Sequence, residues 1–140
     1  MEDKETAFPE EWIRVVMRDV PEGEYIVTSF LQDASGVKIL LDEGEHTVKI
    51  FFDGIPLLIQ STMEGLRMRT WGNVQLKYQN KSIFRKSFLF EVKKSNLVKW
   101  CIQESCGLYE ESELKHYCIV TSEEVIDIIS TFEPVIQKLK

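Results

Sequence analysis

Alternating hydrophobic and polar positions run through the first half of the chain and predict short β-strands. Strand-like stretches are expected over 25–31, 37–41 and 46–52, with turn residues at 33–36 and 42–45 between them. Connections this short join antiparallel neighbours and cannot join parallel ones. The segment therefore predicts an antiparallel meander.

The dipeptide Asp53-Gly54 gives the sharpest local signal, because it suits a two-residue turn with positive φ angles. It separates strand-like residues 46–52 from 55–60, so we predict a β-hairpin here. Alternation then continues and predicts further strands of the same sheet. These expected strands cover 66–71, 74–78 and 88–92.

Helices are expected at three places. Residues 8–20 allow a short N-terminal helix, although their Val and Ile residues suit a strand equally well. Ser95 can cap a helix that Gly107 ends in the left-handed conformation.

A strand over 114–120 is followed by Thr121-Ser-Glu-Glu124, a capping box that predicts the start of a C-terminal helix. Apolar residues at helical spacing support that helix, and Pro134 should kink it. They are Val125, Ile128, Ile129, Phe132 and Ile136. The predicted fold is a single α+β domain over residues 1–140, with a mostly antiparallel sheet, helices packed on one face and a C-terminal helix.

Composition is consistent with one domain and sets the expected compartment. A chain of 140 residues with 44% hydrophobic content can build one core without metals or disulfides. The three Cys residues are an odd number, and the first residues lack the pattern of a secretion signal, so a reducing cytoplasm is expected. No apolar run is long enough to span a bilayer, so no membrane partner is expected.

Charge is distributed unevenly along the sequence. Residues 1–65 carry 14 acids and 5 bases, residues 66–99 one acid and nine bases, and residues 100–140 eight acids and three bases. The basic segment either pairs with acids on neighbouring strands or forms a charged surface. Its interleaved aromatics would suit nucleic-acid binding, but the pI near 5.0 and the core-like alternation of these aromatics make that partner less favoured than a protein.

No catalytic, metal or cofactor site is predicted. Cys101, Cys106, His116 and Cys118 could supply zinc ligands, but Cys101 and Cys106 are five residues apart on an expected helix, which is unlike a zinc turn. A His116–Cys118 nucleophile pair is disfavoured because side chains two apart on a strand seldom touch. We expect His116 at the edge of the core, bonded to a backbone group, and buried Cys residues.

Two acidic clusters flank expected strands and are candidates for a partner-binding surface. Clustered carboxylates on loops would steer association with a basic protein. The candidate residues are Asp42, Glu43, Glu45, Glu110, Glu111 and Glu113. The alternative is that both clusters are ordinary solvated loops.

From Asp53-Gly54 to its end, the chain resembles small bacterial proteins of unassigned function, some similar to immunity proteins that neutralise secreted toxins. The segments that carry this resemblance are 98–100, 104–109, 114–117 and 121–134. The resemblance implies a compact α+β protein that acts by binding, and it implies no catalytic residue. The expected function is a non-catalytic protein-binding domain, with a bacterial toxin as its specific partner. A nucleic-acid-binding domain and a small enzyme with an unrecognised site are the alternatives. The sequence leaves the oligomeric state open.

Overall fold

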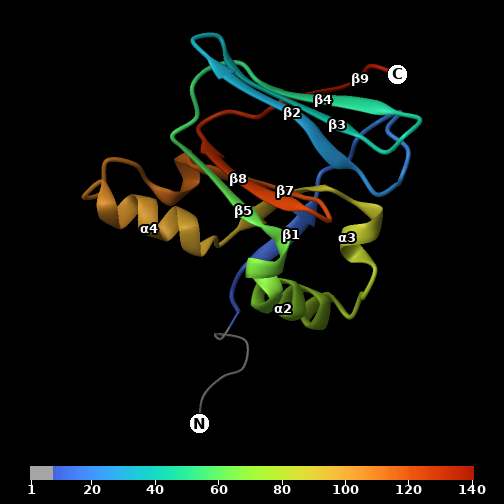
Figure 1. Ribbon diagram of the computed structural model, residues 1–140. Coiled ribbons are helices and arrows are strands. Elements are labelled where there is room, and N and C mark those ends of the chain that lie inside the picture. Colours follow the sequence, from blue (N-terminus) through green and yellow to red (C-terminus); the bar gives the residue numbers. More distant parts are fainter. Residues whose placement is uncertain (1–7) are drawn as a thin grey trace.

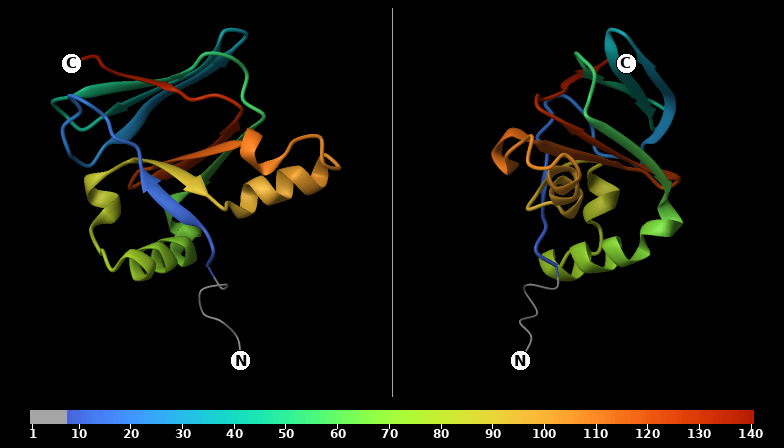
Figure 2. Two further views of the ribbon diagram at one scale, coloured as in Figure 1. Left: turned by 180° about the vertical axis from the view of Figure 1, so that it is seen from behind. Right: turned by 90° about the vertical axis from the view of Figure 1, so that its left-hand side faces the viewer.

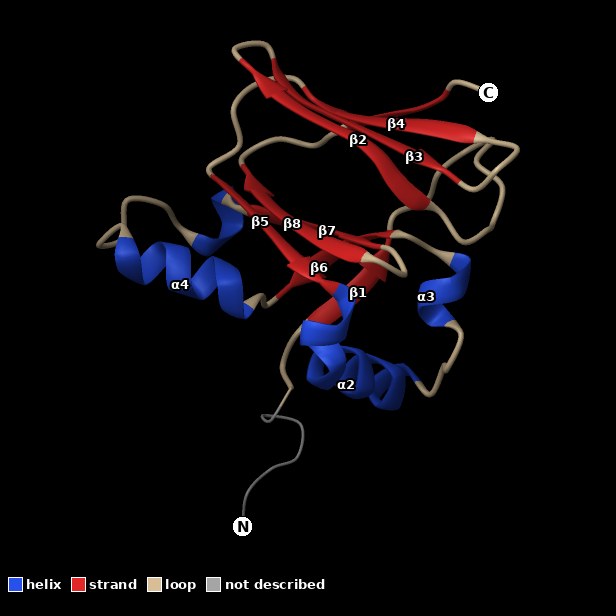
Figure 3. Ribbon diagram, viewed as in Figure 1, coloured by secondary structure: helices blue, strands red, loops and turns tan. Residues whose placement is uncertain are grey.

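A computed structural model describes residues 8–140 and shows two antiparallel sheets stacked face to face (Figures 1 and 3). Sheet A has the strand order β1-β6-β7-β8-β5, and sheet B has the order β2-β3-β4-β9. The strands of sheet A are β1 (Glu11–Arg14), β6 (Leu89–Lys93), β7 (Lys115–Val120), β8 (Glu124–Ser130) and β5 (Leu58–Met63). Those of sheet B are β2 (Ile26–Asp33), β3 (Gly36–Asp42), β4 (Thr47–Phe52) and β9 (Val135–Lys138).

Helices lie on the side of sheet A that faces away from sheet B, so sheet A is the middle layer (Figures 1 and 2). The α-helices are α2 (Met68–Tyr78), α3 (Ile83–Lys86) and α4 (Asn96–Glu104). Two 3-10 turns, η1 (Glu64–Arg67) and η2 (Glu111–Glu113), precede α2 and β7. Within residues 8–140, no helix is long and apolar enough to cross a membrane.

The main core fills the space between the two sheets. Alternate residues of β3 and β4 point inward from sheet B, among them Ile39, Ile50 and Phe52, and all three are fully buried. Ile119 and Ile128 meet them from sheet A. A second core lies under the helices, where the rings of Trp12, Trp71, Phe84 and Phe90 pack together in edge-to-face and tilted pairs.

Several predictions from the sequence are confirmed. The antiparallel meander is present as β2, β3 and β4, with turns at the two predicted positions. Gly36 is required in the first turn, because its φ is +134° and an added Cβ would lie 2.0 Å from the carbonyl oxygen of Phe52. Ser95 caps α4 by accepting the N–H of Val98. Gly107 has the predicted left-handed φ of +77°, but Cys106, with a φ of +55°, is the first left-handed residue after the helix.

The predicted C-terminal helix is wrong, because residues 124–138 form the strands β8 and β9. Thr121 Oγ1 does accept the N–H of Glu124, but Thr121 N also donates to the Glu124 carbonyl, which closes a hairpin turn. One of the two bonds predicted for the capping box is therefore present, but it belongs to a turn between β7 and β8. The β-branched run that follows is buried on both faces of β8, which is typical of a covered inner strand. Pro134 lies in the connection to β9.

Three further predictions are corrected by the structure. The Asp53-Gly54 turn forms no hairpin, since β4 belongs to sheet B and β5 pairs with β8 in sheet A. Residues 66–78, predicted as two strands, form the end of η1 and the helix α2. Residues 8–20 form no helix and contain the strand β1. The single predicted sheet is thus two sheets, because turn chemistry alone does not determine which strand pairs across the turn.

Candidate functional site

A polar cleft of about 490 Å³ is lined by residues of α2, α4 and sheet A. Pockets for small molecules are mostly apolar. Only three of the twelve residues that line this cleft are apolar, namely Phe8, Leu97 and Trp100. The other nine are Glu10, Gln60, Arg67, Arg69, Thr70, Asn73, Asn96, His116 and Asp127.

The floor of the cleft is a row of side chains set by strand register. Gln60, Asp127 and Cys118 are opposite one another on β5, β8 and β7. His116 is two residues before Cys118 and is therefore a diagonal neighbour of Asp127 on the same face. Alternation along the three strands thus brings a carboxylate, an imidazole and an amide together.

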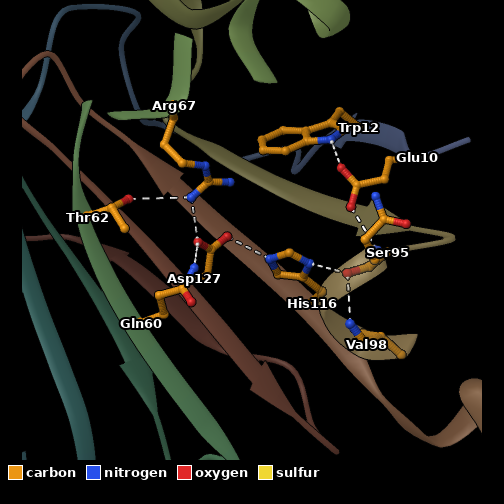
Figure 4. A network of polar contacts seen from close by, with 10 residues as sticks. Glu10, Trp12, Gln60, Thr62, Arg67, Ser95, Val98, His116 and Asp127 are labelled. Atoms are coloured by element: carbon orange, nitrogen blue, oxygen red, sulfur yellow. Dashed lines mark hydrogen bonds and ion pairs between the residues drawn. The ribbon is translucent and has the colours of Figure 1, made fainter. Parts of the chain in front are cut away.

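His116 joins Asp127 to the start of α4 through a buried chain of hydrogen bonds (Figure 4). Its Nε2 lies 2.7 Å from Asp127 Oδ1, and its Nδ1 lies 2.7 Å from Ser95 Oγ. Ser95 Oγ also accepts the N–H of Val98 at 3.1 Å. The Ser95 hydroxyl can then donate its hydrogen bond to Nδ1, and the protonated Nε2 donates to Asp127.

Arg67 binds the other carboxylate oxygen of Asp127 from the end of η1. Its Nη1 lies 2.7 Å from Oδ2, and Gln60 donates to the same oxygen at 3.2 Å. Burial opposes ionisation of Asp127, but the hydrogen bond from His116 and the nearby positive charges outweigh it and lower its pKa to about 2. Burial likewise disfavours charge on Arg67, yet Asp127 raises the pKa of the guanidinium. The ion pair is therefore charged at neutral pH.

Glu10 forms one wall of the cleft and fixes the chain that leads into β1. Its carboxylate accepts Trp12 Nε1 at 3.2 Å and the backbone N–H of Asn96 at 2.8 Å. Lys77 Nζ donates to the Glu10 carbonyl at 2.7 Å. A negative charge at the N-terminus of α4 is favourable, and Glu10 supplies it.

The Ser95–His116–Asp127 chain has the residue types of a hydrolase triad, but its nucleophile is closed off. Ser95 is 1% exposed, and its oxygen is already used by Val98 and His116. Both ring nitrogens of His116 are bonded as they are in a working triad, so the burial of Ser95 is what sets this network apart from a catalytic one.

The structure also disfavours His116 and Cys118 as a nucleophile pair. Cys118 is fully buried, and desolvation raises the pKa of its thiol well above the usual value. The expectation that His116 bonds to a backbone group is wrong, because its partners are the side chains of Ser95 and Asp127. The expectation of buried Cys residues is confirmed for Cys118 and wrong for Cys106, which is exposed, while Cys101 is half-buried. Within residues 8–140, no three His, Cys, Asp or Glu side chains are grouped to hold a metal ion.

The two acidic clusters lie at opposite ends of the molecule, so they form no common surface (Figures 1 and 2). In the turn between β3 and β4, the Asp42 carboxylate accepts hydrogen bonds from Gly44 and Thr47. Burial alone would raise the pKa of Glu43, but hydrogen bonds from His46 and Glu45 outweigh it, and the pKa is lowered. Around η2, the second cluster forms a capping box.

In that box Glu110 and Glu113 each accept a backbone N–H of the other. Several of the predicted carboxylates are therefore used by their own loops. Glu45 and Glu111 are exposed.

Among the described residues, three of the nine bases in the basic segment form ion pairs, and the other six leave the charged-surface alternative open. Arg67 binds Asp127, Lys94 reaches Glu11 on the neighbouring strand at 3.5 Å, and Lys93 lies 3.0 Å from Glu91 of its own strand. The interleaved aromatics are mostly core residues, as the alternation predicted. Trp71, Phe88 and Phe90 are all buried, so they offer no ring to a stacked base.

The residues that organise the cleft were largely missed by sequence reasoning. Asp127 interrupts an otherwise apolar run, and a lone acid between buried β-branched residues was the one available signal. Ser95 was identified only as a cap. Nothing near Arg67 or Glu10 in the sequence indicates their partners, which are 60 and 86 residues away.

The fold and the cleft thus define a two-sheet α+β domain with a closed polar network under an open rim. Comparison with known proteins adds nothing to this class: no protein-family model, no curated protein and no solved structure matches the chain.

Proposed function

We propose that this chain is a non-catalytic protein-binding domain whose partner docks over the rim of the cleft. The observation that carries the proposal is Trp100, which lies on α4 at the cleft and is 51% exposed. Trp and Arg are the residue types most enriched among binding hot spots. Arg69 lines the same cleft from α2 and is exposed.

The saturated floor supports binding over catalysis. Every buried side-chain nitrogen and oxygen in residues 8–140 has a hydrogen-bond partner, so the floor is a rigid base that needs no ligand to complete it. Rim residues Asn73 and Asn96 add adaptable donors and acceptors beside Trp100. An aromatic anchor, an arginine and amides around a firm floor are typical of a protein interface.

Toxin neutralisation is the specific form that we propose for this binding, with a basic toxin as the partner. The net charge of -6 would draw such a partner toward the molecule. Acidic loops at both ends would then raise the association rate, while the cleft rim makes the close contact.

Affinity capture from the native cell, quantified by mass spectrometry, tests the interface. Trp100→Ala should reduce recovery of the partner by about tenfold or more, as expected for a hot-spot residue. Leu108→Ala is the matched control, because Leu108 is 72% exposed and does not line the cleft. Arg69→Ala should also reduce recovery, whereas Lys99→Ala truncates an exposed basic side chain outside the cleft.

Variants of the acidic loops separate the two possible surfaces. If the Trp100 and Arg69 variants retain the partner while Glu45→Gln or Glu111→Gln loses it, the interface lies on that acidic loop and the cleft proposal is wrong. Retention on a nucleic-acid column with steep salt dependence would instead support the nucleic-acid alternative.

A further inference from the structure

Strand β5 is an edge of sheet A and pairs on one side only, with β8. It runs along the outside of the middle layer, as the right-hand view of Figure 2 shows. Its six residues, Leu58–Met63, contain no charge, no proline and no bulge. Edges of this kind are open to pairing with another strand.

The direction of each backbone group on β5 follows from one hydrogen bond. Glu64 N donates to the Glu123 carbonyl at 3.0 Å, so this residue pair is a hydrogen-bonded one. Such pairs alternate along an antiparallel ladder, which turns the N–H and C=O groups of Ile59, Ser61 and Met63 away from β8. No hydrogen bond within residues 8–140 uses these outward backbone groups.

The other three edges of the two sheets carry features that discourage pairing. β1 is four residues long and includes Glu11 and Arg14. β2 has a bulge after Val27, and β9 is four residues long and ends at Lys138. Short strands, charges and bulges all protect an edge, and β5 has none of these.

Exposed apolar side chains continue the β5 edge at both ends. Ile55 and Leu57 precede the strand with exposures of 65% and 46%. Met63 ends it, and Leu66 and Met68 follow, with exposures of 70%, 76% and 64%. Large contiguous apolar surfaces mark interaction sites. A partner strand at β5 would cover part of this surface.

We propose that β5 pairs antiparallel with β5 of a second copy, forming a homodimer whose twofold axis passes Ser61. The backbone groups that point outward belong to Ile59, Ser61 and Met63, and the axis passes the middle residue of the three. With the axis at Ser61, that residue faces Ser61 of the second copy and Ile59 faces Met63 of the second copy. Gln60 then lies opposite Thr62 of the second copy, so no like charges meet along the strand. The two copies of sheet A become one continuous sheet.

This self-complementarity favours a second copy over a foreign strand. An uncharged strand with apolar residues at equal distances from its centre matches its own reverse, and a twofold interface requires that match. The dimer goes beyond the proposed function because it uses a different surface. The partner would dock on α2 and α4, whereas the dimer forms through the outward backbone groups of β5.

Sedimentation velocity and light scattering over a wide concentration range test the dimer. The wild-type chain and Ser61→Ala should both form a dimer of twice the 16.4 kDa monomer mass. Ser61→Pro removes the outward N–H donor and leaves the β8 ladder untouched, so the dimer should weaken by about tenfold to a hundredfold. Ser61→Lys should give a monomer, because two charges would meet on the axis.

Circular dichroism separates a lost dimer from a lost fold. Ser61→Lys changes an exposed side chain and should keep the far-UV spectrum of the wild type even if Ser61→Pro does not fold. A wild-type monomer at every concentration, or a dimer unaffected by Ser61→Lys, would overturn the proposal. A monomer that captures another protein through β5, with capture lost in Ser61→Lys, would also overturn it and assign the edge to a foreign strand. The Trp100 variants are independent of all these outcomes.

Discussion

Replacing Asp127 by alanine should destabilise the protein more than any surface substitution. The carboxylate is 1% exposed and bonds Arg67, His116 and Gln60, so its removal leaves a partly buried guanidinium without a counter-charge. Breaking a buried ion pair in this way costs about 3–5 kcal/mol. Arg67 retains 18% exposure, so we expect a loss of about 3 kcal/mol, at the lower end.

Urea unfolding at neutral pH, followed by tryptophan fluorescence and far-UV circular dichroism, measures this loss. The double variant Arg67→Met with Asp127→Leu is the matched control, because it removes both charges and keeps apolar volume. It should be more stable than Asp127→Ala, since no charge is left unpaired. An Asp127→Ala variant that loses less than about 1 kcal/mol would refute the reasoning, because exposed pairs have that value.

The same carboxylate makes stability depend on pH in a defined direction. Its pKa is about 2 in the folded protein and about 3.9 in an unfolded chain, so the unfolded state takes up protons first as pH falls. The stabilisation is complete above about pH 4 and is lost toward pH 2, and it amounts to about 2–3 kcal/mol. Asp127→Asn should lack this part of the pH dependence. Equal slopes for both proteins between those pH values would contradict the assignment.

Two further predictions test the turn and the closed network. Gly36→Ala should prevent stable folding, because its Cβ would lie 2.0 Å from the Phe52 carbonyl oxygen, whereas Gly44→Ala has no atom within 4 Å and should cost only about 1–3 kcal/mol for its φ of +111°. Thermal unfolding compares the melting temperatures of the two glycine variants. Similar melting temperatures would show that the close approach of Gly36 to the Phe52 carbonyl oxygen does not limit stability. A fluorophosphonate probe should leave Ser95 of the native protein unmodified, because that side chain is 1% exposed. Intact-mass detection of a Ser95 adduct would revive the hydrolase interpretation.

Local features of the fold were predictable where one short segment determines them. The turns around Gly36 and Gly44 and the Ser95 cap depend on residues within a few positions of each other. The antiparallel meander follows from such turns. The burial of Phe88 and Phe90 could also be foreseen from the alternation around β6, whereas Trp71 is buried on α2, where a strand was predicted.

The C-terminal strands were mispredicted because two signals in that segment are ambiguous. A threonine hydroxyl bonded to an N–H three residues later occurs in a helix cap and equally in a hairpin turn, as at Thr121 and Glu124. A strand buried on both faces also loses its alternation, so β8 matched a helical period by chance. β-branched residues at Val125, Ile126 and Ile128 were the better guide.

The cleft could not be predicted because it is assembled by sheet register. Asp127 meets Gln60 and Cys118 only after β5, β8 and β7 are placed side by side, and the sequence of each strand alone does not determine that order. The acid within the β8 run indicated that something must satisfy it. It did not indicate that Arg67 would.

Sheet A joins strands that are distant in the chain, and this has a consequence for how the protein folds. β1 pairs with β6, whose residues follow about eighty positions later, and β5 pairs with β8 across more than sixty. Only the β7–β8 hairpin of this sheet closes locally, so loop-closure entropy opposes every other pairing. Assembly of the middle layer should therefore take milliseconds to seconds, typical of domains rich in non-local contacts. During synthesis, the sheet cannot be completed until β8 has left the ribosome, whereas the β2–β3–β4 meander can form long before.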